Sequence, residues 1–196
     1  MEKDTSPPVS RRDALGTLVA LGLSLFAPRR VAGAPFAARW NDRFELAVNV
    51  EIAQPQGGRA RRPYVAVWVE NPAGQSVRTL SLWVQNSGRG PRWIPDLRRW
   101  YRAERERQSA GGAGLVGTVS SPTRAAGAYT VLWNGRDDAG QPVDQGEYHV
   151  CVEAAREHGT YQLIRQPFTF ASRAFRAELG GNAEISRVAV DFRERR

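Results

Sequence analysis

The chain has 196 residues, a net charge of +8 and a single cysteine. This length suffices for one domain with a hydrophobic core, and 41% hydrophobic and 24% charged residues are ordinary values for a globular protein. A lone cysteine excludes an intrachain disulfide, zinc ribbons and c-type haem attachment. The basic residues are scattered and form no recognised nucleic-acid-binding motif, so we expect no nucleic-acid partner.

Residues 1–34 have the three parts of a secretory signal. Arg11 and Arg12 precede an apolar run at residues 14–27, and small residues follow at residues 31–34, where two cleavage points fit. The run is too short to span a membrane, and the paired arginines resemble a bacterial twin-arginine signal. The sequence therefore predicts export to the periplasm of a mature chain without a transmembrane span.

Alternation of apolar and polar residues predicts strands along much of the remaining chain. Residues 44–53 alternate cleanly, and residues 64–84 form two apolar runs around the turn chemistry of residues 71–74. Residues 160–170 give a further strand, and residues 172–192 surround a Gly-Gly-Asn turn. We expect a hairpin at residues 64–84 and another at the C-terminal end.

Residues 93–108 break the β pattern. The spacing of one helix face is found in four residues, Leu97, Trp100, Tyr101 and Glu104. This predicts one short amphipathic helix near residues 95–107, lying across an edge or end of a sheet. The Gly-rich residues 108–122 that follow are expected to form a loop.

The clearest strand–turn–strand pattern lies at residues 125–159. Tyr129 and Trp133 mark the alternation before a polar turn, and Tyr148 begins the alternation after it. We expect these two strands to pair as a central hairpin. About eight such strands predict an all-β, antiparallel, immunoglobulin-like β-sandwich as a single domain at residues 35–196. Its core is expected to contain Trp68, Trp83 and Trp133 with Tyr129 and Tyr148.

Two parts of this pattern resemble known families. Residues 127–148 resemble the immunoglobulin-like hairpin of the flagellar hook-capping protein. Three blocks, at residues 64–70, 78–83 and 153–159, resemble a bacterial family of predicted periplasmic proteins, domain of unknown function 2271. The second resemblance implies a periplasmic or inner-membrane partner in a redox system, such as a PepSY-type membrane protein or the FAD:protein FMN transferase.

Three candidate metal ligands lie near the end of the central stretch. His149 and Cys151 share one face of a strand with Glu153, and together they offer nitrogen, sulfur and oxygen donors to copper or zinc. The favoured alternative is that a lone cysteine is a small core residue. His158 stands beside Glu157 at a hairpin tip, where it could bind a metal or sense pH.

The alternative for this tip is purely structural: Gly159 makes the turn, while Arg156 and Glu157 pair across the strands. A similar choice applies to Asn134, Asp137 and Asp138. They resemble part of a calcium loop, but the full spacing is missing, so a solvated turn is favoured.

A basic helix face is the main candidate for partner binding. It carries six arginines, Arg92, Arg98, Arg99, Arg102, Arg105 and Arg107. Such a face could receive a phosphate, a haem propionate or an acidic protein, or it could simply be solvated. The predicted partner-binding residues are Arg98, Arg99, Arg102, Arg156, Glu157 and His158.

Thr123 is the candidate for cofactor attachment. Ser120 and Thr123 match two positions of the segment that the FMN transferase modifies, whereas Ser121 and Pro122 depart from it. The resemblance implies covalent FMN on the Thr123 hydroxyl. The favoured alternative is an ordinary loop before a strand.

No set of nucleophile, base and acid can be assembled from the spacing of the residues. The sequence therefore predicts a non-enzymatic, exported periplasmic binding or accessory module with no cofactor. The alternative is a redox carrier with covalent FMN or a bound metal.

Overall fold

The computed structural model describes residues 38–54 and 61–195. The predicted signal at residues 1–34, with Arg11 and Arg12, lies outside the described residues. The elements are, in chain order, β1 (Phe44–Ile52), β2 (Tyr64–Glu70), β3 (Ser76–Trp83), η1 (Gly90–Asp96), α1 (Arg98–Ser109), α2 (Val116–Val119), β4 (Ser120–Ser121), β5 (Gly127–Trp133), β6 (Gly146–Ala155), β7 (Tyr161–Phe170), β8 (Phe175–Gly180) and β9 (Ile185–Glu194).

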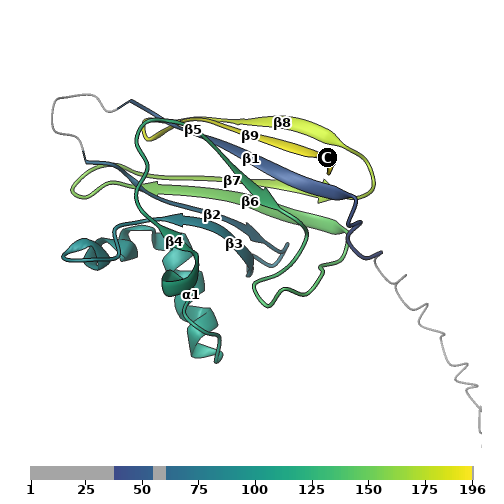
Figure 1. Ribbon diagram of the computed structural model, residues 1–196, viewed down its shortest axis with the longest axis horizontal. Coiled ribbons are helices and arrows are strands. Elements are labelled where there is room, and N and C mark those ends of the chain that lie inside the picture. The colour runs from purple at the N-terminus through teal and green to yellow at the C-terminus, as the bar shows by residue number, and fades with distance from the viewer. Residues whose placement is uncertain (1–37, 55–60, 196) are drawn as a thin grey trace, which may run out of the picture. The chain divides into compact units, whose positions relative to one another are not determined.

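The strands form two sheets that lie as two layers (Figure 1). The four-stranded sheet has the order β5-β1-β9-β8, and the five-stranded sheet has the order β4-β3-β2-β6-β7. All pairs are antiparallel except β3 with β4. The prediction of a mostly β, antiparallel fold is confirmed, as are the β2–β3 and β8–β9 hairpins.

The central hairpin was predicted wrongly. Strand β5 pairs with β1, placing Val131 opposite Val48, while β6 lies in the other sheet between β2 and β7. The two strands therefore face each other across the core, where the Trp133 and Tyr148 rings lie 5.6 Å apart. Alternation shows which face of a strand is buried, but it does not show whether the next strand is beside it or opposite it.

The main core lies between the two sheets. Strand β1 contributes the alternate residues that were predicted to be buried, and its neighbours in the cluster include Trp133, Phe170 and Phe192. Trp83 is buried in this cluster, and Tyr129 and Tyr148 pack against it, as expected. These contacts join strands that are far apart in the sequence.

A second core lies on the outer face of the five-stranded sheet. Here Trp68 packs with Ile94, Leu97 and Trp100 of the η1–α1 segment. Two predictions are corrected: Trp68 is not between the sheets, and the helix covers the face of a sheet, not an edge or end. Strand β2 is buried on both faces, which explains its continuous apolar sequence.

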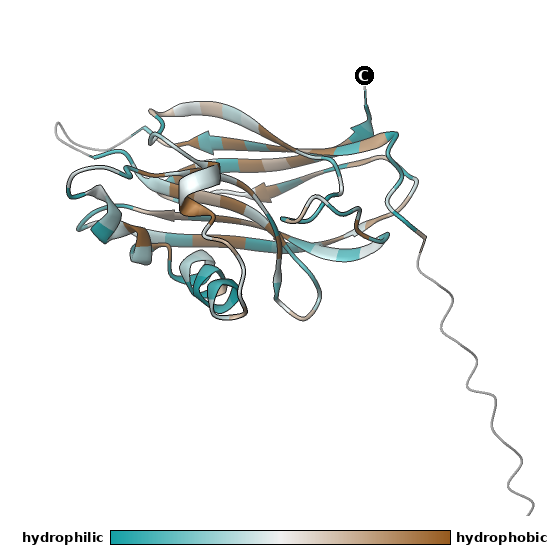
Figure 2. Cartoon of the chain, turned by 60° about the horizontal axis from the view of Figure 1, so that its bottom comes forward, coloured by the Kyte–Doolittle hydropathy of each residue, from teal (hydrophilic) through white to brown (hydrophobic). Residues whose placement is uncertain are grey.

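The helix and the strands behind it differ in hydropathy. Helix α1 is mostly hydrophilic along its length, whereas the strands carry alternating hydrophilic and hydrophobic bands (Figure 2). The predicted loop at residues 108–122 contains the short helix α2 and strand β4, which pairs with the end of β3. Within the described ranges, no helix has the length and apolar character needed to cross a membrane.

Candidate functional site

Helix α1 begins on a carboxylate from another element. Its N-cap residue, Leu97, has no side chain that can accept a hydrogen bond. Glu153 of β6 replaces the missing cap, because its two carboxylate oxygens accept hydrogen bonds from the backbone N–H groups of Arg99 at 2.8 Å and Trp100 at 2.9 Å. Burial raises the pKa of Glu153, and the two N–H groups oppose that rise.

Glu70 fixes the same helix through side chains. Its carboxylate accepts hydrogen bonds from Arg99 Nε and Nη2 and from Arg165 Nε, each at 2.8 Å, and from Trp68 Nε1 at 3.0 Å. Burial alone would raise its pKa, but the bonds from Arg99, Arg165 and Trp68 outweigh burial and lower it. Arg99 therefore ties α1 to β2, and Arg165 ties β7 to the same carboxylate.

Glu104 holds the chain that leaves α1. Its buried carboxylate accepts hydrogen bonds from Arg107 Nη2 and Gln108 Nε2, each at 2.7 Å, and from the Leu115 backbone N–H at 2.8 Å. Three buried glutamates thus fix the start, the inner face and the exit of the helix. The outer face of α1 is consequently presented on a rigid support.

The predicted metal ligands do share one face of β6, but they have other roles. Cys151 is fully buried under the helix, and burial raises the pKa of its thiol. Glu153 caps α1, and His149 lies opposite Glu70 in the β2–β6 register. Across residues 38–54 and 61–195, no three or more His, Cys, Asp and Glu side chains are grouped so that they could hold a metal ion.

The tip between β6 and β7 is built differently from either sequence interpretation. Arg156 pairs with Glu184 and Glu157 with Arg61, so these two residues do not pair with each other. His158 adopts the left-handed conformation with φ of 54°, so the turn residue with positive φ is His158 and not Gly159. The His158 side chain is 78% exposed.

The helix arginines divide into two groups. Arg99 and Arg107 turn inward to Glu70 and Glu104. Exposed positions are occupied by Arg92, Arg98, Arg102 and Arg105, of which the last three follow i, i+4, i+7 spacing on α1. We call these four arginines and His158 the basic surface.

Two aromatic contacts connect the parts of the basic surface. The Trp93 ring lies 4.8 Å from the His158 ring and 4.7 Å from the Arg92 guanidinium. The Arg98 guanidinium lies 4.5 Å from the Tyr161 ring, on the strand that follows the tip. The structure thus brings together partner-binding candidates that were predicted separately.

Thr123 lies in the segment between β4 and β5 and is half-buried. Its carbonyl oxygen accepts a hydrogen bond from Arg62 Nη1 at 3.3 Å. The neighbouring Arg124 guanidinium lies 5.7 Å from the Tyr129 ring and 5.9 Å from the Trp83 ring. Two cationic side chains therefore flank this threonine.

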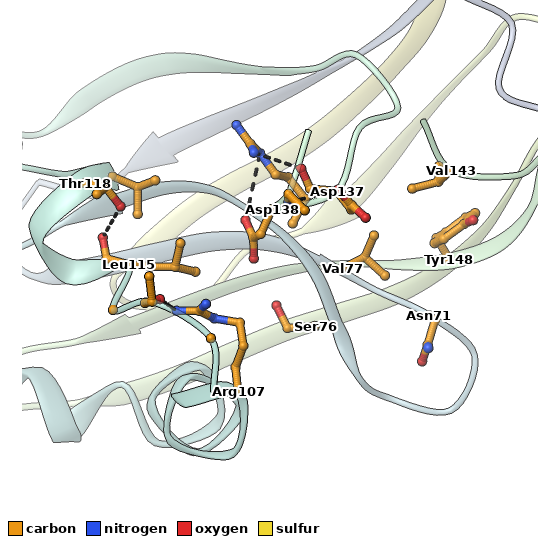
Figure 3. Close-up of a pocket in the computed structure, with 16 residues that line it drawn as sticks. Asn71, Ser76, Val77, Arg107, Leu115, Thr118, Asp137, Asp138, Val143 and Tyr148 are labelled. Atoms are coloured by element: carbon orange, nitrogen blue, oxygen red, sulfur yellow. Dashed lines mark hydrogen bonds and ion pairs between the residues drawn. The ribbon is translucent and has the colours of Figure 1, made fainter. Parts of the chain in front are cut away.

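A groove of about 970 Å³ opens beside the first residues of β3 (Figure 3). Its walls are the loop after α1, including Leu115 and Thr118, and the turn at Asp137 and Asp138. The sequence interpretation placed Asp138 in a solvated turn. The structure instead buries much of its side chain, and turn chemistry alone gives no signal of that burial.

The comparisons with known proteins identify a family. A scan against protein families matches residues 45–187 to DUF2271, described as a predicted periplasmic protein. The chain belongs to this family. The match extends from β1 into β9, beyond the blocks that carried the resemblance in the sequence. Searches of the curated proteins and of the solved structures gave no match, and the likeness to the hook-capping protein is not confirmed.

Proposed function

We propose that this DUF2271 protein is a non-enzymatic periplasmic binding or accessory module that docks an acidic partner protein on the basic surface. The observation that carries the proposal is the division of the helix arginines. Arg99 and Arg107 are neutralised by buried glutamates, while Arg98, Arg102 and Arg105 are exposed on one face. Exposed arginines on a rigid helix favour an acidic surface by charge complementarity.

The partner is proposed to be a periplasmic protein or the periplasmic face of an inner-membrane protein. The family description supports this compartment. The resemblance that was stated from the sequence adds candidates from redox systems, namely PepSY-type membrane proteins and the FAD:protein FMN transferase. The two facing sheets are in keeping with an immunoglobulin-like sandwich, which stays a prediction.

Site-specific crosslinking tests this function. A photoreactive residue at position 102 should crosslink one acidic protein in the native periplasm, and a triple Arg98→Glu, Arg102→Glu, Arg105→Glu variant of the same protein should lose that product. Binding of the purified partner should weaken as salt rises, because salt screens exposed charges.

The matched control reverses three exposed arginines in or beside the four-stranded sheet, Arg43, Arg173 and Arg195. Its net charge changes equally, so unaltered crosslinking is expected if the basic surface is the binding site. Equal loss in both triple variants would show that only net charge matters, which would contradict a defined docking surface.

Export by the twin-arginine route belongs to the same proposal. Arg11 and Arg12 are expected to be read as a pair by the receptor, so replacing both with Lys should block processing although the charge is kept. Cell fractionation and intact mass of the mature chain measure this. A Lys–Lys variant that is processed normally would place the protein on the Sec route.

A redox carrier with covalent FMN on Thr123 is the alternative, and the positions of Arg62 and Arg124 favour it. Guanidinium groups beside a threonine could neutralise the phosphate of an attached flavin. Co-expression with an FMN transferase should then add one FMN mass that disappears in Thr123→Ala. An unchanged mass, or an addition that survives this substitution, would remove the alternative.

A further inference from the structure

Asp138 takes the place of a neighbouring strand at the edge of β3. Strand β4 pairs only with Leu82 and Trp83, so the earlier part of β3 has no strand on that side within the described ranges. The Asp138 backbone N–H donates to the Val77 carbonyl at 3.0 Å, and its Oδ1 accepts from the Thr79 N–H at 3.0 Å. One residue thus satisfies both groups of the exposed edge.

The second carboxylate oxygen is unpaired. Asp138 Oδ2 is buried, and no donor in residues 38–54 or 61–195 lies within hydrogen-bond distance of it. The carboxylate points into the groove, toward the side formed by Leu115 and Arg107 (Figure 3). A buried acceptor without a donor is costly and therefore calls for an explanation.

The two arginines in the groove are already occupied. Arg78 Nη1 donates to the Asp137 carbonyl at 2.9 Å, and Arg78 Nε lies 4.0 Å from Asp138 on the Oδ1 side. Arg107 is paired with Glu104. Neither guanidinium satisfies Oδ2, so the free acceptor remains available to a ligand.

The remaining lining indicates what else the ligand carries. The floor is formed by side chains that pack against the main core, Val77, Val143 and Tyr148, and the wall after α1 adds Leu115 and Val119. A short hydrocarbon chain can cover these surfaces while a donor reaches the carboxylate. A positively charged donor gives the stronger hydrogen bond to an ionised acceptor.

We propose that this groove binds a ligand that carries a primary ammonium group on a short aliphatic chain, with the ammonium donating to Asp138 Oδ2. The site is separate from the basic surface, and it does not depend on the proposed docking function. Burial raises the pKa of Asp138, against the Thr79 N–H and the charges of Arg78 and Arg107 and together with Glu104. An ammonium would offset that burial by pairing with the ionised form.

Titration of the full-length mature protein with n-butylamine tests the proposal. Amide resonances of Thr79 and Ala139 should shift with saturation at neutral pH, whereas n-butanol and butyrate of equal chain length should give weaker shifts. Asp138→Asn keeps an oxygen for the Thr79 N–H but places an NH2 group in the groove, so affinity should fall about tenfold to a hundredfold. Binding should also weaken as the pH falls and Asp138 becomes protonated.

Thr118→Phe provides a second variant that leaves every bond of Asp138 in place. Thr118 is exposed on α2 and lines the groove, so a larger side chain should block it. Loss of butylamine binding in both variants, with unchanged melting temperatures, would support the site. Equal binding of butanol, binding that survives Asp138→Asn, or no binding of butylamine would overturn the proposal.

Discussion

The outer faces of the two sheets carry similar ion pairs in opposite surroundings. On the five-stranded sheet, Glu70 binds two arginines beneath α1 and its side chain is 1% exposed. On the four-stranded sheet, Asp191 also binds two arginines, Arg176 and Arg193, but the Arg176 side chain is 79% exposed. The same chemistry is thus sealed from water on one face and open to it on the other.

This difference decides what the charges do. Breaking a buried pair leaves charges without a partner or water, whereas water replaces a lost partner at the surface. The buried glutamates therefore fix the position of a helix, while the open pairs connect neighbouring strands that the sheet already holds together. The comparison predicts a graded series of effects, from Glu70 to Asp191.

The largest effect is expected for Glu70→Ala. It would leave Arg99, Arg165 and the Trp68 indole without their shared acceptor beneath the helix, at a cost of about 3–5 kcal/mol in the free energy of unfolding. Urea denaturation measures it. Glu178→Ala is the matched control, because its pair with Arg187 is exposed. Similar losses in both variants would contradict the role assigned to burial.

A smaller effect is expected for Glu153→Ala. Two N–H groups at the start of α1 would lose their acceptor, at a cost of about 1–3 kcal/mol. Hydrogen exchange should accelerate at the Arg99 and Trp100 amides more than in the sheet. Glu153→Gln keeps one acceptor oxygen and should recover part of the loss. Unchanged exchange at these amides in the Ala variant would show that α1 does not need this cap.

The sequence could predict the strands but not these long-range partners. Phe44–Ile52 alternates, so its buried face follows from local pattern, and the continuous apolar run of β2 already indicates a strand. Glu70 and Glu153 meet Arg99 and Trp100 only because the η1–α1 segment folds back over the sheet. No local spacing encodes that contact, and the incorrect central hairpin has the same origin.

The two buried glutamates should respond oppositely to pH. The pKa of Glu70 is lowered from 4.5, so its contribution to stability is present above that pH and is lost as the pH falls through its folded pKa. The pKa of Glu153 is raised from 4.5, so its contribution is present below that pH and is lost as the pH rises through its folded pKa.

Urea unfolding of the single Gln variants between pH 3 and pH 7 separates the two contributions. Glu70→Gln should lose less stability than the unsubstituted protein on acidification. Glu153→Gln should lose less than the unsubstituted protein as the pH rises above 4.5. Parallel pH profiles for both variants would contradict the assignment of opposite shifts.

The smallest effect is expected on the open face, for Asp191→Asn. Hydrogen bonds from Arg176 lower the pKa of Asp191 against a smaller opposing effect of burial, so the carboxylate is ionised in the folded protein. Water nevertheless reaches the pair, and the loss should stay below about 1 kcal/mol. It should shrink further in high salt, whereas the loss in Glu70→Ala should not, since salt screens exposed charges more than buried ones. A loss in Asp191→Asn as large as that in Glu70→Ala, and independent of salt, would mean that the helix cover does not set the energetics of these pairs.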